Sequence, residues 1–159
     1  MQKLKILIAE DDPLTLTLLE KLLTGWGYEV FSARDGQTAR RILQSHDDFH
    51  ICILDWEMPE LNGRDLCAWI HATDLYPVPY VILLTAKGNP QHICDGFAAG
   101  ADDYITKPFE RDDLRYRLAS LALRVMRSEA LGQEAARMDP IDMYRLDLST
   151  YSKTLSLPT

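Results

Sequence analysis

Several short apolar runs of this sequence end on a side chain that can take part in chemistry. Carboxylates that lie close together repel one another, and this repulsion raises the pKa of at least one of them. A hard divalent cation such as Mg²⁺ relieves the repulsion, because its preferred ligands are carboxylate and phosphate oxygens. A carboxylate can also act as a nucleophile and form an acyl phosphate. The side chains in question are Glu10, Asp11, Asp12, Asp55, Thr85 and Lys107.

This set of groups is suited to Mg²⁺-dependent phosphoryl transfer, which needs mainly positioning and neutralisation of charge. Mg²⁺ would bridge the carboxylates and one phosphoryl oxygen, while Lys107 and the Thr85 hydroxyl would contact the other two. Each residue alone has a simpler interpretation. Asp11 or Asp12 can cap a helix, and Asp55 can belong to a turn. The joint pattern favours the chemical interpretation.

The spacing of apolar residues predicts the elements that position these groups. Strand-length runs alternate with segments of helical periodicity. Such alternation predicts an α/β fold, with a doubly wound parallel sheet and helices on both faces. The carboxyl ends of the strands meet at one edge, where the sites of such folds lie. The predicted strands are Leu4–Ala9, Tyr28–Ser32, Phe49–Leu54, Tyr80–Leu84 and Asp103–Thr106.

Composition limits the class of protein. The 159 residues, of which 47% are apolar and 26% charged, suit one domain with a short extension. No run approaches about 18 apolar residues and no secretion signal is evident, so we expect no membrane span and no export. Three scattered cysteines, Cys52, Cys67 and Cys94, argue against a disulfide framework or a zinc site and favour the cytoplasm. The formal charge of −7 argues against direct nucleic-acid binding by this segment.

With these features in place, the sequence resembles the receiver domain of two-component response regulators. The resemblance covers residues 3–124 and rests on four motifs in the expected order. The spacing agrees as well, since Thr85 follows Asp55 by 30 residues and Lys107 follows it by 52. The motifs are ILIAEDDP (6–13), LDWEMPELNG (54–63), VILLTAK (81–87) and AGADDYITKPF (99–109).

The resemblance implies a flavodoxin-like five-stranded sheet in the order 2-1-3-4-5, and it implies a role for each site residue. Asp55 would be the phosphoacceptor, and Lys107 would contact the phosphoryl group. Mg²⁺ would be the cofactor, with Asp11 and Asp55 as direct ligands. Glu10 would contribute through a water molecule, and Glu57 through its backbone carbonyl.

The resemblance also implies a switch. Thr85 would move toward the phosphoryl group, and Tyr104 would rotate inward to fill the space that Thr85 leaves. The Lys107–Pro108 peptide bond would be cis. Asn62-Gly63 would form a tight turn before the third helix.

Three positions depart from or add to the usual pattern. Glu10 stands where an aspartate is more common. Glu57 adds a carboxylate beside the site, and Lys87 follows Thr85 by two residues. Glu57 and Lys87 could pair with each other or tune an attacking water, so we expect them to affect the lifetime of the phosphoryl group, in a direction that the residues leave open.

The expected partner is a sensor histidine kinase or a histidine phosphotransfer protein, which would supply the phosphoryl group from a phosphohistidine. We expect slow self-dephosphorylation and no classical enzyme activity. One alternative is a pseudo-receiver, a binding module that never takes phosphate; the complete set of acids, Thr85 and Lys107 argues against it. The other is a phosphatase of the haloacid-dehalogenase type, but that family has a second aspartate where this chain has Glu57.

A dimer face is a further expectation. The resemblance implies that phosphorylation repacks the surface formed by the fourth helix, the fifth strand and the last helix. In winged-helix regulators, acids and arginines at similar positions pair across a dimer; the alternative is that these charges are simply solvated. The charged residues on this surface are Asp102, Asp103, Arg117 and Arg124.

The last part of the chain carries less signal. We divide it into a receiver domain, residues 1–124, and a helical extension with a tail, residues 125–159. Leu114, Leu118, Leu121 and Val125 repeat at 4-3-4 spacing, so the last helix, which begins near Arg111, could extend as a short coiled coil and support a homodimer.

The output is undecided. Asp139-Pro140 ends the helix, as in receivers linked to diguanylate cyclases, but the rest of that motif is missing. Runs at 144–148 and 154–157 could be strands of the kind that precede winged-helix DNA-binding domains. About 20 residues cannot build an independent core, so a stand-alone receiver with a tail is the third option.

Other chemically interesting residues receive no role in catalysis or metal binding. The four histidines show no ligand spacing. Trp26 and Trp69 are interpreted as packing residues, and Trp56 is expected near the mouth of the site because it follows Asp55 directly. The histidines are His46, His50, His71 and His92.

Overall fold

The computed structural model describes residues 3–86 and 89–137, with side chains described as far as residue 132. Strands and helices alternate along this part of the chain. The strands are β1 (Lys5–Ala9), β2 (Glu29–Ala33), β3 (Ile51–Asp55), β4 (Tyr80–Ala86) and β5 (Asp103–Lys107). The helices are α1 (Pro13–Gly25), α2 (Gly36–Ser45), α3 (Gly63–Ala72), α4 (Pro90–Ala98) and α5 (Arg111–Arg137).

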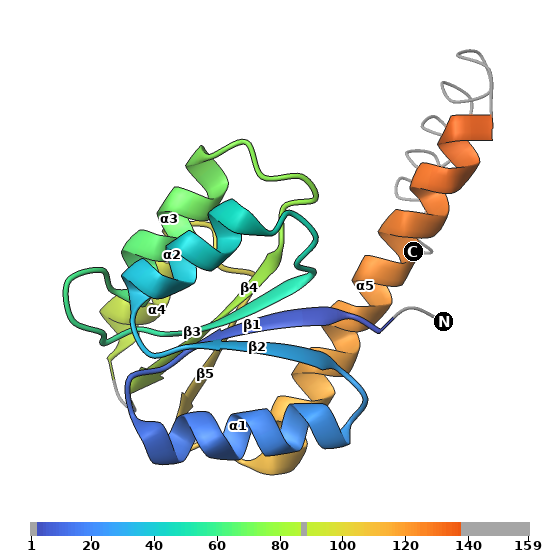
Figure 1. Ribbon diagram of the computed structural model, residues 1–159. Helices are drawn as coiled ribbons and strands as arrows, with labels where there is room; N and C mark the ends of the chain where they lie inside the picture. Colours follow the sequence, from blue (N-terminus) through green and yellow to red (C-terminus); the bar gives the residue numbers. More distant parts are fainter. Residues whose placement is uncertain (1–2, 87–88, 138–159) are drawn as a thin grey trace, which may run out of the picture. The chain divides into compact units, whose positions relative to one another are not determined.

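The five strands form one parallel sheet in the order β2-β1-β3-β4-β5 (Figure 1). This confirms the predicted doubly wound α/β fold. The chain runs from β1 outward to β2 and then crosses to β3 on the other side, so the strand order reverses between β1 and β3. The carboxyl ends of these two strands are therefore the topological switch point, where sites of such folds lie.

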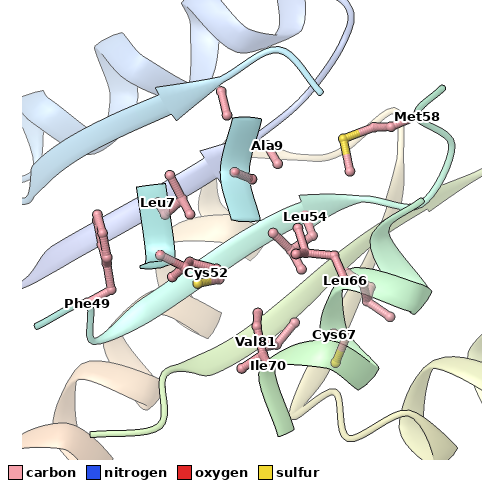
Figure 2. Packing of buried hydrophobic residues seen from close by; sticks show 14 of the residues in the cluster. Leu7, Ala9, Phe49, Cys52, Leu54, Met58, Leu66, Cys67, Ile70 and Val81 are labelled. Carbon is pink, nitrogen blue, oxygen red and sulfur yellow. The ribbon is translucent and has the colours of Figure 1, made fainter. Parts of the chain in front are cut away.

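Side chains of the strands alternate between two apolar cores, one on each face of the sheet. Leu7 and Ala9 face a core that is completed by α2 and α3, shown in Figure 2. Ile6 and Ile8 face a second core, which is completed by α1 and by the start of α5. Each buried leucine or isoleucine contributes about 1.5–3 kcal/mol, so the two cores hold the strand ends in fixed positions.

Four helices begin at a polar cap whose side chain accepts a hydrogen bond from a backbone N–H in the first turn. Asp12 caps α1 and Asp35 caps α2, with acceptance from Thr15 N and Thr38 N. Asn62 caps α3 and Asn89 caps α4. The prediction that Asp12 caps the first helix is confirmed. Two of these caps lie in loops that follow strands at the switch point, Asp12 after β1 and Asn62 after β3. Capping therefore also holds these two loops in place.

The observed strands differ slightly from the predicted ones. The third begins at Ile51 instead of Phe49, because Phe49 is buried by an edge-to-face contact with Phe31 at 5.2 Å and not by a place in the strand. The fourth continues to Ala86, because Thr85 and Ala86 pair with residues of β5. The predicted packing of Trp26 and Trp69 against the cores is confirmed.

Helix α5 confirms the predicted extended last helix. One compact unit of the chain ends at Leu121, and a second begins at Ala122. Across residues 3–86 and 89–137, no helix has the length and hydropathy to span a membrane. The predictions for Lys87, for the helix end at Asp139-Pro140 and for strands at 144–148 and 154–157 lie outside the described residues. The division of the chain at residue 124 stays a prediction.

Candidate functional site

The carboxyl ends of β1, β3, β4 and β5 bring the sequence-predicted residues to one edge of the sheet. Glu10 directly follows β1 and is fully buried, and Asp55 ends β3 with 5% of its surface exposed. Thr85 in β4 is buried as well, at 2%. Asp11 is exposed, so the cluster has a buried floor and one solvent-facing acid. Lys107, the last residue of β5, completes the set.

Three carboxylates of this edge converge. Glu10, Asp11 and Asp55 each offer one carboxylate oxygen, and these oxygens lie within 4.8 Å of one another. The ammonium group of Lys107 lies 2.8 Å from Oε2 of Glu10 and 3.1 Å from Oδ1 of Asp55. Three carboxylates thus gather beside one ammonium group, which contacts two of them, and the cluster has an excess of negative charge.

The protonation of the cluster reflects this imbalance. Burial, and then the charge of Glu10, raises the pKa of Asp55 to about 7. Burial opposes the charged form of Lys107, but hydrogen bonds and charges from Glu10 and Asp55 outweigh it and raise the pKa of Lys107. The ammonium group therefore stays charged, whereas the Asp55 carboxylate is held in a site that disfavours its negative charge.

The cluster fits a divalent cation. Oxygens bound to one Mg²⁺ lie about 3–4 Å apart, so the observed separations require only a small contraction of the side chains. A cation here would remove the repulsion that raises the pKa of Asp55. Oxygen ligands alone, with one acid open to solvent, match the preference of Mg²⁺ for carboxylates and retained water. The residues present are therefore suited to the predicted cofactor.

The loop after β3 is held close to the strand by a glycine. A Cβ atom on Gly63 would lie 2.3 Å from the backbone oxygen of Asp55, which is closer than any side chain tolerates. The N–H of Gly63 donates to the carbonyl of Trp56 at 3.0 Å, and Asn62 caps α3. Gly63 permits this close approach and Asn62 starts the helix, so the loop folds back over the end of β3.

An open hollow adjoins the acidic cluster. Asp11, Glu57 and Asn62 line it, together with Trp56 and His92. Glu57 is exposed and is one of the residues that line this hollow; its part as a carbonyl ligand stays a prediction. The expectation that Trp56 lies near the mouth is confirmed, although its side chain is only 8% exposed.

The two predicted switch residues lie on neighbouring strands and line a common cavity. The Thr85 hydroxyl is buried and has no hydrogen-bond partner within the described part of the chain. The Tyr104 ring packs edge-on against Phe97 at 5.8 Å, and the Arg117 guanidinium lies over it at 5.9 Å. Their role as a switch pair stays a prediction.

Three of the four charged residues of the predicted dimer face have an identified partner within the protomer. Asp102 accepts a hydrogen bond from Val81 N at 2.9 Å, which ties it to the start of β4. Asp103 pairs with Arg117 at 2.6 Å, and Arg117 also contacts Asp113 at 3.0 Å. Arg124 lies on α5 beyond Leu121. Asp102, Asp103 and Arg117 thus take part in contacts within the protomer, and the part of all four residues in a dimer stays a prediction.

Two features of the site were not predicted from the sequence. His92 stacks on Trp56, with ring centroids 4.4 Å apart and planes 9° from parallel. Arg117 reaches the ring of Tyr104 in the same protomer. The sequence offers only a weak hint of the first contact, namely a histidine in the first turn of a helix that begins at Asn89-Pro90.

The Lys107–Pro108 bond is cis as predicted, and the cis Tyr76–Pro77 bond was not predicted.

A family model of the response regulator receiver domain matches residues 6–119. This chain belongs to that family. The receiver family is the signal-accepting part of two-component systems, and the five-stranded fold and the acidic edge described above agree with the assignment.

Similar proteins cover the same part of the chain. The regulator YrkP of Bacillus subtilis (strain 168), named a transcriptional regulatory protein, is 38% identical over 114 residues, 72% of this chain and 47% of YrkP. Protein PetR of Rhodobacter capsulatus is 35% identical over 146 residues, 91% of this chain and 60% of PetR. The chain thus spans about half the length of the curated relatives it matches. The solved receiver domain of a signal transduction histidine kinase from Syntrophus aciditrophicus has a TM-score of 0.67 at 36% identity, over 74% of this chain and 88% of that domain.

Proposed function

We propose that this receiver accepts a phosphoryl group on Asp55 in a Mg²⁺-dependent reaction and controls an output through the resulting change of conformation. One observation carries the proposal. A nearly buried carboxylate at the end of β3 lies within 4.8 Å of two further acids and 3.1 Å from an ammonium group. Buried carboxylates so close together repel one another and would not stabilise a protein core. They are suited to binding a cation and a phosphoryl group together.

The transfer step is a nucleophilic displacement at phosphorus. A carboxylate oxygen of Asp55 forms a bond to phosphorus while the P–N bond of the donor's phosphohistidine breaks. The imidazole nitrogen of the donor keeps the bonding electron pair and takes up a proton from solvent. Asp55 becomes an acyl phosphate, with Lys107 beside it to balance the added charge. The Thr85 hydroxyl, which is buried without a partner among the described residues, would donate a hydrogen bond to a phosphoryl oxygen.

Glu10, Asp11 and Asp55 would hold Mg²⁺, with the backbone carbonyl of Glu57 as a further ligand. The bound cation supplies neutralisation of charge during transfer. Glu10 has a second task, because its Oε1 accepts a hydrogen bond from Asp12 N at 3.2 Å while Oε2 pairs with Lys107. Glu10 therefore orients both the loop after β1 and the ammonium group.

The donor is a phosphohistidine protein, a sensor kinase or a phosphotransfer protein, that contacts α1. Leu14 is 82% exposed and Leu18 is 48% exposed, and both lie on one face of α1 because they are four residues apart. Helix α1 begins directly after the acids that follow β1, so a protein docked on this apolar face would stand beside Asp55. Small phosphodonors need no such surface.

The chain acts as a phosphoacceptor rather than as an enzyme on an external substrate. The pseudo-receiver alternative explains neither the buried acid pair nor the Lys107 contacts. The phosphatase alternative needs a second acid directed at the substrate two residues after Asp55, and the side chain there, Glu57, is exposed.

We propose that the controlled output is transcription. Several relatives that match this chain are named transcriptional regulatory proteins, and the chain spans about half of their length. This favours the DNA-binding class over the cyclase-linked and stand-alone options. Nucleic-acid binding would then belong to another part of the protein.

The proposal is tested by the mass of the intact protein after incubation with acetyl phosphate and Mg²⁺. We expect the gain of one phosphoryl group in the wild type, no gain with EDTA present and no gain in Asp55→Asn. The exposed Asp48→Asn is the matched control and should gain the group. A folded wild-type protein that gains none would contradict the proposal and favour a phosphate-independent module.

A further inference from the structure

A cavity lies between α4 and the ends of β4 and β5, next to the proposed switch residues. Its volume is only about 10 Å³, room for about one water molecule. Thr85 and Tyr104 contribute to its wall from the sheet, and Ile93 and Phe97 contribute from α4. His92 also lines it. The cavity is therefore the space next to both switch side chains, and its lining decides which groups Tyr104 meets when it turns inward.

Two buried polar atoms at this cavity have no hydrogen-bond partner within the described part of the chain, Oγ1 of Thr85 and Nδ1 of His92. A buried polar atom without a partner costs free energy, so each calls for a physical explanation. The proposed contact with a phosphoryl oxygen accounts for Thr85. Nothing in the phosphoryl-transfer chemistry accounts for His92.

The His92 ring is held in place. It stacks on Trp56 at 4.4 Å, and its backbone N–H donates to the capping side chain of Asn89 at 3.3 Å. Gly96, one turn further along α4, allows the helix to approach closely. A Cβ atom there would lie 2.7 Å from Cδ1 of Leu83 and 3.3 Å from Cζ3 of Trp56. Trp56 in turn directly follows the phosphoacceptor, so the ring is anchored to the site and to α4 at once.

We propose that Nδ1 of His92 accepts a hydrogen bond from the Tyr104 hydroxyl when, in the phosphorylated protein, Tyr104 turns inward into the space that Thr85 leaves. His92 is then a positioning residue that stabilises the switched state. In the state described here the Tyr104 ring instead packs on Phe97 and under Arg117. The inference rests on the proposed function, because it is the phosphoryl group that engages Thr85 and leaves His92 Nδ1 as the remaining buried atom without a partner at this cavity, among the described residues; Asp103, which also lines it, is paired with Arg117.

The chemistry of the pair is complementary. A phenol is a hydrogen-bond donor, and Nδ1 of a neutral imidazole is an acceptor when Nε2 carries the proton. The bond would form only in the switched state. It would therefore strengthen the binding of any ligand that selects that state, in proportion to its own free energy. A neutral hydrogen bond corresponds to about 2- to 10-fold in an equilibrium constant.

The test measures binding of beryllofluoride, a phosphoryl mimic that associates with aspartate carboxylates, at saturating Mg²⁺. His92→Phe keeps a ring on Trp56 and removes the acceptor, and Tyr104→Phe keeps the ring and removes the donor. We expect each variant to bind about 2- to 10-fold more weakly than the wild type, and the double variant to bind no more weakly than either single variant. The control His46→Phe, an exposed ring that contacts Phe31 and Phe49, should bind like the wild type.

Other results overturn the inference in distinguishable ways. If the wild type binds beryllofluoride and His92→Phe binds equally well, or if the two losses add in the double variant, there is no bond between these side chains. If the wild type itself does not bind, the proposed function fails along with the inference. A second readout is the ¹⁵N resonance of His92 Nδ1. It should shift on addition of beryllofluoride in the wild type but not in Tyr104→Phe; a shift in both proteins, or in neither, would contradict the contact.

Discussion

Nζ of Lys107 lies 3.1 Å from Oδ1 of Asp55, and this single ammonium group also pairs with Glu10 at 2.8 Å. Because the acceptor carboxylate is almost fully buried, most of the neutralisation of its charge in the absence of a cation comes from β5. Lys107 therefore links the stability of this edge of the sheet to its ability to bind a phosphoryl group.

Replacement of Lys107 by methionine should destabilise the protein. The substitution keeps the length of the side chain but leaves Glu10 and Asp55 without a counter-charge, which we expect to lower the free energy of unfolding by about 2–3 kcal/mol in EDTA. Saturating Mg²⁺ should recover part of the loss, because a ligand that binds only the folded protein stabilises it. Urea unfolding with and without Mg²⁺ measures both quantities.

A matched control is Lys5→Met. Lys5 forms a pair of similar length with Asp48, at 2.7 Å, but Asp48 is half exposed. We expect little change in stability and no dependence on Mg²⁺. Equal losses of unfolding free energy in Lys107→Met and Lys5→Met would contradict the claim that Lys107 neutralises a buried acidic cluster.

Asp55→Asn should alter the dependence of stability on pH. The pKa of Asp55 is raised to about 7 in the folded protein by burial and by Glu10, above its value of about 4 in the unfolded chain. The stabilising contribution of a group with a raised pKa is present at low pH and is lost as pH rises through the folded-state value. In EDTA, Asp55→Asn should therefore resemble the wild type below about pH 4, gain on it between pH 4 and pH 7, and be more stable at pH 8 by on the order of 2–4 kcal/mol.

Asp48→Asn should change the dependence of stability on pH in the opposite direction. A hydrogen bond from Lys5 lowers the pKa of Asp48, so its contribution is present at neutral pH and is lost as pH falls through the folded-state value. Thermal or urea unfolding at several pH values separates the two cases. An Asp55→Asn protein that is less stable than the wild type at pH 8 without a divalent cation would show that the acidic edge is not under charge repulsion.

Gly63→Ala should disrupt the loop over the site. The added Cβ would lie 2.3 Å from the Asp55 backbone oxygen, so either the loop or the end of β3 must move. We expect a loss of about 2–3 kcal/mol in the free energy of unfolding and a slower reaction with acetyl phosphate. Gly25→Ala is the control, since nothing lies within 4 Å of a Cβ at that position, and it should be neutral or stabilising by about 0.5 kcal/mol. Equal effects of the two substitutions would contradict the role given to Gly63.

The three thiols should differ sharply in reactivity. Cys94 is exposed, whereas Cys52 and Cys67 are buried. Burial raises the pKa of Cys67 to about 12 and also raises that of Cys52. Ellman's reagent should modify Cys94 quickly and the other two only at the rate of unfolding, because the thiolate is the reactive form. Rapid modification of all three in the native protein would contradict the packing of the core around β3 and α3.

The sequence predicted the site edge well because parallel strands impose it. Once Asp55, Thr85 and Lys107 are each seen to end a strand, the sheet alone brings them together, and no knowledge of side-chain rotamers is needed. The parallel sheet was predictable for the same reason, since the alternation of apolar runs allows few other folds. Four motifs in order then identified the family.

Contacts that depend on the direction of individual side chains were not predictable in this way. Whether His92 reaches Trp56 depends on where α4 lies, and Gly96 sets this distance through contacts with Leu83 and Trp56 that no periodicity shows. The sequence left open whether Arg117 pairs across a dimer or is solvated, and its ion pair with Asp103 within the chain was not predicted. The end of a strand is similarly ambiguous, because Phe49 is as buried as a strand residue although it precedes β3.

The most direct test of the account is to locate the phosphoryl group within the chain. Protein treated with acetyl phosphate and Mg²⁺ is reduced with borohydride, which converts an aspartyl phosphate to homoserine, and the digested peptides are sequenced by mass spectrometry. We predict homoserine at position 55 alone, and none when EDTA replaces Mg²⁺. Reduction at position 10, 11 or 57, or no reduction in folded protein, would contradict the assignment of Asp55 as the phosphoacceptor.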